Sequence, residues 1–80
     1  MTSIEYTYHN NGTIFEMISK NENGKLDGVQ KGYHLNGQLW YEQCYENGLK
    51  EGIQKEYYIN DQLRYEYYCE NGRLIWQKEY

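Results

Sequence analysis

Residues 36–58 decide the fold and read Asn36-Gly-Gln-Leu-Trp-Tyr-Glu-Gln-Cys-Tyr-Glu-Asn-Gly-Leu-Lys-Glu-Gly-Ile-Gln-Lys-Glu-Tyr-Tyr58. The pattern returns 24 residues later as Asn60-Asp-Gln-Leu-Arg-Tyr-Glu-Tyr-Tyr-Cys-Glu-Asn-Gly-Arg-Leu74. A weaker copy precedes it, starting at Asn11. A period of about 20 to 50 residues marks a repeat array, so each residue has to be interpreted by its place in the repeat.

Turn signals divide the chain into short segments. Asn-Gly stands at residues 11, 23, 36, 47 and 71, and Asn60-Asp61 fills the remaining place. Asn-Gly is a strong hairpin signal because both residues tolerate the positive φ of a type I′ turn. Six turns predict an antiparallel meander of about seven strands, over residues 4–10, 13–20, 29–35, 38–46, 53–59, 62–70 and 74–79. The turns at 11, 36 and 60 are predicted to be tight. Those at 23 and 47 continue as Gly-x-x-x-Gly and are predicted to be longer loops.

Side chains alternate between the two faces of a strand, so the numbering predicts which residues share a face. We expect the core face to carry Ile4, Tyr6, Tyr8, Ile14, Ile18, Val29, Tyr33, Leu39, Tyr41, Tyr45, Ile53, Tyr57, Leu63, Tyr65, Tyr67 and Cys69. We expect the other face to be solvated and to carry Glu5, His9, Gln30, His34, Glu42, Glu46, Gln54, Glu56, Arg64, Glu66 and Glu70. Several apolar side chains also fall on this second face, namely Phe15, Met17, Trp40, Cys44, Tyr58 and Tyr68. Exposed apolar residues that lie together often mark a contact surface.

Length and charge limit the possible functions. Eighty residues make one small domain, and the net charge of −4 gives no electrostatic basis for binding nucleic acid or an anionic membrane. An acidic chain is better suited to meeting a basic surface on another protein. Eleven tyrosines and the absence of proline favour strands.

The termini and the cysteines point to the cytoplasm. The first residues lack the basic and apolar regions of a signal peptide, and no apolar run approaches the roughly 20 residues that span a bilayer. Cys44 and Cys69 are too few for a disulfide framework and are expected on opposite faces, as free thiols. Because the chain begins with Met1 and holds three repeats, we expect it to be complete and to act alone.

The second unit resembles a MORN-type repeat at Leu39-x-x-Glu42-x-x-Tyr45-x-Asn47-Gly48-x-x-x-Gly52-x-x-x-x-Tyr57-Tyr58-x-Asn60. The variant is the bacterial one found in YwqK-type antitoxin-like proteins. The resemblance covers about three units, approximately residues 4–28, 29–52 and 53–80, in one domain over residues 1–80. It implies an all-β fold in which a row of hairpins forms an elongated, twisted antiparallel sheet. It also implies a protein-interaction role, and the antitoxin label implies neutralisation of a partner toxin. Repeat architecture by itself does not fix a function.

Catalytic and cofactor motifs are missing from the sequence. There is no nucleophile elbow, no Gly-rich phosphate loop that leads into a helix, and no zinc-ligand spacing. His9 and His34 precede equivalent Asn-Gly turns, so duplication of the repeat accounts for both without a metal ion. We therefore expect no enzymatic activity, no metal and no cofactor.

A ladder of carboxylates is the candidate binding surface. Repeat equivalence places Glu42 level with Glu66, two strands apart at roughly 9 to 10 Å, and Glu46 level with Glu70. Aromatic side chains on the same face complete the candidate set: Trp40, Glu42, Glu46, Tyr58, Glu66, Tyr68 and Glu70. A large aromatic anchor within a charged surround is typical of binding hot spots. The competing interpretation is a solvated face that only keeps the sheet soluble.

These observations predict a small acidic inhibitor that occludes a larger protein with a basic surface. The partner would be a toxin, for an antitoxin or immunity protein, or a nucleic-acid-processing enzyme, for a phage anti-CRISPR protein. The alternative is a self-associating MORN scaffold without an inhibitory role, in which the first strand pairs with a second chain to give a homodimer.

Overall fold

The chain folds into a single antiparallel β-sheet. The computed structural model describes residues 2–80, which contain the strands β1 (Ser3–Tyr8), β2 (Ile14–Lys20), β3 (Gly28–Tyr33), β4 (Leu39–Glu46), β5 (Leu49–Lys50), β6 (Gly52–Tyr57), β7 (Leu63–Glu70) and β8 (Arg73–Glu79). The described residues include no helix, and hence none that could cross a membrane. The predicted all-β meander is confirmed. The short strand β5 is an addition that the turn spacing did not indicate.

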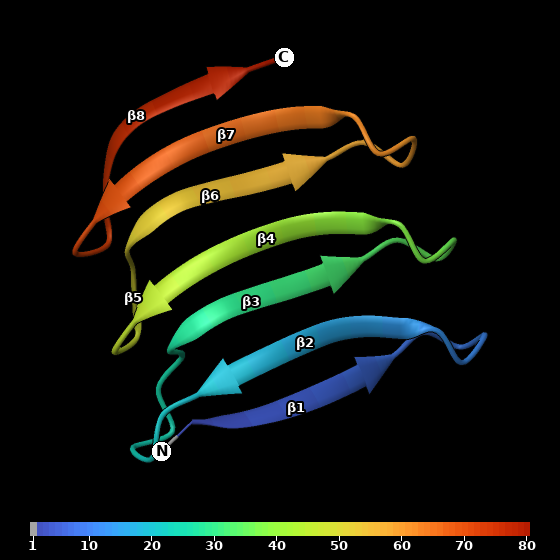
Figure 1. Ribbon diagram of the computed structural model, residues 1–80, viewed down its shortest axis with the longest axis horizontal. Helices are drawn as coiled ribbons and strands as arrows, with labels where there is room; N and C mark the ends of the chain where they lie inside the picture. The colour runs from blue at the N-terminus through green and yellow to red at the C-terminus, as the bar shows by residue number, and fades with distance from the viewer. Residues whose placement is uncertain (1) are drawn as a thin grey trace.

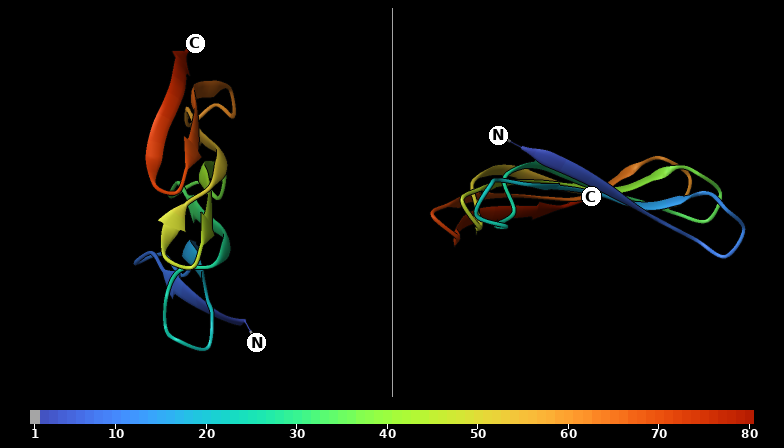
Figure 2. Two further views of the ribbon diagram at one scale, coloured as in Figure 1. Left: turned by 90° about the vertical axis from the view of Figure 1, so that its left-hand side faces the viewer. Right: turned by 90° about the horizontal axis from the view of Figure 1, so that it is seen from below.

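The strands lie side by side in nearly sequential order. The order is β1-β2-β3-β4-β6-β7-β8, with β5 paired to the end of β4, and every pairing is antiparallel. Figure 1 shows β1, β3, β6 and β8 running one way and the strands between them running the other. The molecule measures 34 × 32 × 13 Å, and Figure 2 shows it edge-on as one twisted layer. All eight strands of residues 2–80 belong to this one sheet.

The turn at Asn47, predicted to be a longer loop, is tight, and the turns at Asn11, Asn36 and Asn60, predicted to be tight, are three-residue loops. Asn23 lies in a longer connection over residues 21–27, as predicted. At Asn47-Gly48 and Asn71-Gly72 both residues have positive φ, as a two-residue hairpin turn requires. At the turn that begins with His9, only Gly12 has positive φ (87°), and the His9 N–H donates to the Thr13 carbonyl across a three-residue loop. In the three-residue loops the side-chain oxygen of Asn11, Asn36 or Asn60 accepts the N–H of the residue two positions later, which stabilises the loop.

Two buried glutamines join successive hairpins. β4 and β6 pair only at Tyr41–Glu56 and Glu42–Lys55. Near Gly52, where φ is 95°, the β6 backbone is no longer paired with β4. The Gln54 side chain fills the gap: its Oε1 accepts the Cys44 N–H at 2.7 Å and its Nε2 donates to the Cys44 carbonyl at 2.9 Å. Gln30 bridges in the same way to Ser19, at 2.6 and 2.8 Å. The expectation that both glutamines are solvated is wrong: they are 0% and 5% exposed, because their amides replace a peptide group between strands.

The register also corrects the assignment of residues to faces. Val29 lies opposite Cys44, and Ile53 lies opposite Tyr68. Directly opposed residues share a face. Because the two numbers in each pair have an odd sum, odd residues of β3 and β6 share a face with even residues of β4 and β7. Val29 and Ile53 therefore lie on the face of Cys44. The numbering had placed them on the face of Tyr41, and that prediction is wrong.

The two faces differ in character. The tyrosine face carries Tyr41, Tyr45, Tyr65, Tyr67 and Cys69, and the charged face carries Lys31, Glu42, Lys55, Glu66 and Lys78. Cys69, at 3% exposed, is the one buried hydrophobic side chain among the described residues. A single layer leaves the rest of the predicted core partly exposed, because nothing in residues 2–80 packs over either face. Cys44 and Cys69 are free thiols on opposite faces, as predicted.

Candidate protein-interaction surfaces

The predicted glutamate ladder is part of a row of alternating charge. Lys31, Glu42, Lys55, Glu66 and Lys78 lie directly opposite one another on five neighbouring strands. The Lys31 Nζ lies 3.8 Å from a Glu42 carboxylate oxygen. Glu42 and Glu66 are two strands apart, as the repeat arithmetic predicted, but Lys55 lies between them. The charged face therefore offers a partner mixed charge in place of an uncompensated acidic stripe.

The remaining acidic candidates lie beside the tight turns. The Tyr68 hydroxyl donates to the Glu70 carboxylate at 3.0 Å, and this hydrogen bond raises the pKa of Tyr68. The ring of Tyr68 stacks on Trp76 with the centroids 6.3 Å apart. Glu46 lines a polar hollow of about 270 Å³ together with Asn47, Leu49, Glu51 and Asn71. This end of the sheet is acidic and exposed, so its carboxylates are available to a partner.

Trp40 lies elsewhere, because a β-bulge turns it away from the charged face. Gly32 pairs with Tyr41 but Tyr33 pairs with Leu39, so Trp40 is the extra residue on its strand. Its indole N–H donates to a Glu56 carboxylate oxygen at 3.3 Å, and Glu56 lies opposite Tyr41. The prediction that Trp40 shares a face with Glu42 and Tyr68 is therefore wrong.

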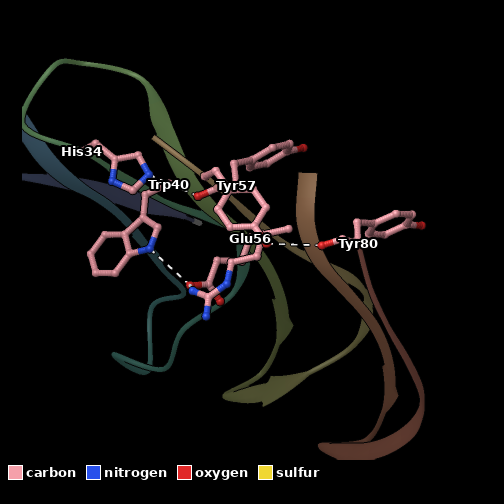
Figure 3. Close-up of polar contacts among 7 residues, drawn as sticks. His34, Trp40, Glu56, Tyr57 and Tyr80 are labelled. Carbon is pink, nitrogen blue, oxygen red and sulfur yellow. Dashed lines mark hydrogen bonds and ion pairs between the residues drawn. The ribbon is translucent and has the colours of Figure 1, made fainter. Parts of the chain in front are cut away.

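The surroundings of Trp40 form a small cluster at one side of the sheet (Figure 3). His34 stacks on the indole with the ring centroids 5.6 Å apart. Arg64 donates to the same Glu56 oxygen at 3.3 Å and lies over the ring of Tyr58. Glu56 thus ties the indole to the guanidinium, which fixes the orientation of both.

An apolar groove opens beside this cluster. It has a volume of about 350 Å³ and is lined by His9, Tyr33, His34, Leu35, Trp40 and Ile59. Leu35 and Ile59 are each 59% exposed at the tips of successive three-residue loops. We call this surface the loop-edge groove. Large apolar side chains held at neighbouring loop tips give a partner an anchoring site that a solvated loop would not.

Hydrogen bonds between repeats fix the shape of the loop-edge groove. Nε2 of His9 bonds the Tyr33 carbonyl at 2.8 Å, and Nε2 of His34 bonds the Tyr57 carbonyl at 3.1 Å. The Tyr58 hydroxyl continues the series by donating to the Tyr80 carbonyl at 3.2 Å. Each loop is thereby hydrogen-bonded to the end of the equivalent strand in the following repeat. The groove is therefore largely preformed.

The seven predicted binding residues therefore divide between two regions. Trp40 and Tyr58 lie at the loop edge, and Glu42, Glu46, Glu66, Tyr68 and Glu70 lie on the charged face or beside the tight turns. Sequence analysis missed Leu35 and Ile59. Their signal was an apolar residue directly before Asn36 and before Asn60, where a loop tip is ordinarily polar.

A close approach between two strands shapes the tyrosine face. The ring of Tyr41 lies over Gly32, where a Cβ would come within 2.0 Å of the ring. The Tyr41 hydroxyl donates to Glu16 at 2.9 Å, which holds the ring in that position. Burial, reinforced by the Glu16 carboxylate, raises the pKa of Tyr41 to about 12.

The described residues assemble no cluster of metal ligands. Residues 2–80 contain no group of three or more His, Cys, Asp or Glu side chains placed to hold a metal ion. His9 and His34 each use one ring nitrogen to bond a backbone carbonyl. Burial, followed by the nearby Glu42 carboxylate, raises the pKa of the Cys44 thiol, which disfavours the nucleophilic thiolate.

Comparison with known families agrees with the repeats seen in the sheet. The family model described as the MORN repeat variant matches residues 26–47 and 50–71. Each match runs from the loop that precedes a repeat, across a hairpin, to the next tight turn. No curated protein and no solved structure matches the chain significantly. The two matches together cover more than half of the chain, which therefore belongs to the MORN repeat variant family.

Proposed function

We propose that this chain is a non-catalytic, protein-binding inhibitor that works in the cytoplasm. It covers a functional surface of a larger protein, such as a toxin or a nucleic-acid-processing enzyme. The loop-edge groove makes the central contact, and the mixed charges of the sheet form the rim. Inhibition is stoichiometric, because the described residues offer shape and charge but no assembled reactive groups.

The observation that carries this proposal is the preformed, uncovered loop-edge groove. Trp40 has His34 against its ring and Glu56 on its indole N–H, so little side-chain entropy remains to be lost on binding. Exposed Leu35 and Ile59 stand at its mouth. A rigid aromatic anchor beside apolar loop tips is the arrangement in which a few residues provide most of the binding free energy.

The test is capture of the partner with matched tryptophan variants. The tagged wild-type chain is expected to recover a partner from lysate of its native host and to inhibit that partner's activity at a molar ratio of one. Trp40→Ala should weaken binding to the purified partner by about 30-fold, which corresponds to the loss of one hot-spot side chain. Calorimetric titration of the purified pair measures this change.

Trp76→Ala is the matched control, because Trp76 lies on edge strand β8 and does not line the groove. Its affinity should stay within about threefold of the wild type, as expected of a residue outside the hot spot. Equal losses in the two variants, or binding without inhibition, would refute the proposed mode of action.

Edge strand β8 favours self-association as a second candidate function. Its free edge carries Leu74, Ile75 and Trp76, which are between 43% and 54% exposed. An unpaired apolar strand is a template for pairing with another chain. Because β1 and β8 run in the same direction (Figure 1), antiparallel pairing that keeps the two tyrosine faces on the same side requires like edges to meet. Light scattering decides this: a dimer that Ile75→Lys converts to a monomer supports the scaffold, and a wild-type monomer excludes it.

A further inference from the structure

A second cavity, on the tyrosine face, shares no lining residue with the loop-edge groove. It has a volume of about 400 Å³ and is lined by Lys50, Tyr65, Tyr67, Cys69, Gly72, Leu74 and Gln77. The Lys50 Nζ donates to the Tyr67 hydroxyl at 2.7 Å and lies 5.1 Å from the centre of that ring. The cavity therefore combines one ammonium group, aromatic walls and an aliphatic side.

The equivalent position in the neighbouring repeats is apolar. Leu26 bridges to Lys20, Lys50 pairs with Tyr45, and Leu74 pairs with Cys69, so positions 26, 50 and 74 occupy the same place in successive repeats. Leucine stands at the first and third of these positions. The fold does not require a lysine there, and Lys50 is the one charged side chain of the three.

A cavity one repeat earlier shows which lining residues are particular to this one. One repeat earlier, Leu26, Tyr41, Gln43 and Tyr45 line a smaller cavity of about 180 Å³. In the second cavity their counterparts are Lys50, Tyr65, Tyr67 and Cys69. In the second cavity Cys69 replaces a tyrosine, Tyr67 replaces a glutamine, and Lys50 replaces a leucine, which adds a cation to the wall.

Lys50 lacks an anionic partner among the described residues. No carboxylate of residues 2–80 forms an ion pair with its Nζ, whereas Lys20, Lys31 and Arg64 each have one. A half-buried ammonium loses hydration, and one hydrogen bond to a neutral hydroxyl restores only part of that loss. Two of its three donors stay free for a ligand. The Tyr67 hydroxyl accepts from Lys50, so its own hydrogen is free to donate as well.

We propose that this cavity binds an acidic side chain, Asp or Glu, presented by a peptide segment of another protein. The carboxylate accepts hydrogen bonds from Lys50 Nζ and the Tyr67 hydroxyl, and the aliphatic part of the segment packs on Leu74. Charge complementarity selects the ligand, since a carboxylate supplies the anion that the Lys50 ammonium lacks. The site differs from the loop-edge groove in position and chemistry, so either one can fail without the other.

Peptide titration followed by NMR tests the site directly. The probes are N-acetyl-Gly-Leu-Glu-Gly-amide and the same peptide with Gln in place of Glu, each titrated into the ¹⁵N-labelled full chain. We expect the Glu peptide to shift the amide resonances of Lys50, Tyr67 and Leu74 in a saturable manner. The Gln peptide, which has the same shape without the charge, should bind about tenfold more weakly.

Lys50→Leu removes the cation while restoring the residue found at both equivalent positions, so the variant is expected to fold. It should lose the preference for Glu over Gln, whereas Lys20→Met, which removes a lysine paired to Glu5, should keep it. Inorganic phosphate is titrated separately. Equal binding of the two peptides, shifts spread over the whole sheet, or saturation by phosphate with no response to the Glu peptide would each overturn the proposal.

Discussion

Replacing Gln54 with leucine is expected to lower the free energy of unfolding by about 3 kcal/mol. The substitution keeps the volume but removes the amide that bonds both the N–H and the carbonyl of Cys44. Three hydrogen bonds of about 1 kcal/mol each are lost, one to the Cys44 N–H and two to the Cys44 and Gly52 carbonyls. The Cys44 carbonyl still accepts the Glu51 N–H, but the Cys44 N–H loses its partner at a site where the side chain was fully buried. Urea denaturation monitored by tryptophan fluorescence measures the change.

Gln54→Glu and Gln77→Leu separate the causes. The glutamate keeps an oxygen for the Cys44 N–H but replaces the donor that faces the Cys44 and Gly52 carbonyls, so it should be destabilising at neutral pH and less so in acid. Gln77 lies on the exposed edge strand β8, and its leucine variant should change stability by less than about 0.5 kcal/mol. Equal effects at 54 and 77 would contradict the bridging role of Gln54.

Gly32→Ala is expected to destabilise the fold by about 2 kcal/mol, because the new methyl group would overlap the ring of Tyr41. Gly32 does not have a positive φ, so the cost arises from the ring and not from the backbone. Relieving the overlap requires the ring to move, which breaks its hydrogen bond to Glu16. Thermal unfolding measured by circular dichroism gives the loss.

A double-mutant cycle provides the control. Tyr41→Leu removes the ring, so Gly32→Ala in that background should cost less than about 0.5 kcal/mol. An undiminished cost in the double variant would show that the glycine is required for some other reason.

The sequence was sufficient for the architecture because the repeat and the turn residues are local signals. Asn-Gly, or Asn60-Asp61 in one place, marked each predicted hairpin turn, and the 24-residue period placed the equivalent strands. The details that failed depend on the exact length of a loop or on partners distant in the chain. Whether Asn47 or Asn36 forms the tight turn is decided by the loop around it, and the burial of Gln54 is decided by a backbone gap opposite Cys44.

The candidate site was only partly predictable for the same reason. Alternation along one strand shows which of its residues share a face, but matching the faces of neighbouring strands requires the register between them. The bulge at Trp40 also breaks the alternation within its strand. The opposition of Lys55 to both Glu42 and Glu66 likewise appears only once strands are paired. The apolar loop tips were visible as residue types, but their convergence into one groove required the three-dimensional arrangement of the hairpins.

The buried glutamine bridges also bear on how such a chain diversifies. Gln30 and Gln54 act within the plane of the sheet, and the loop ties from His9 and His34 run along its edge, so these bonds do not depend on which side chains project from either face. A position such as 26, 50 and 74 has accordingly accepted both leucine and lysine in successive repeats while its strand pairing persists. Substitutions at such positions on a face are therefore expected to leave the strand pairing intact at little cost in folding free energy.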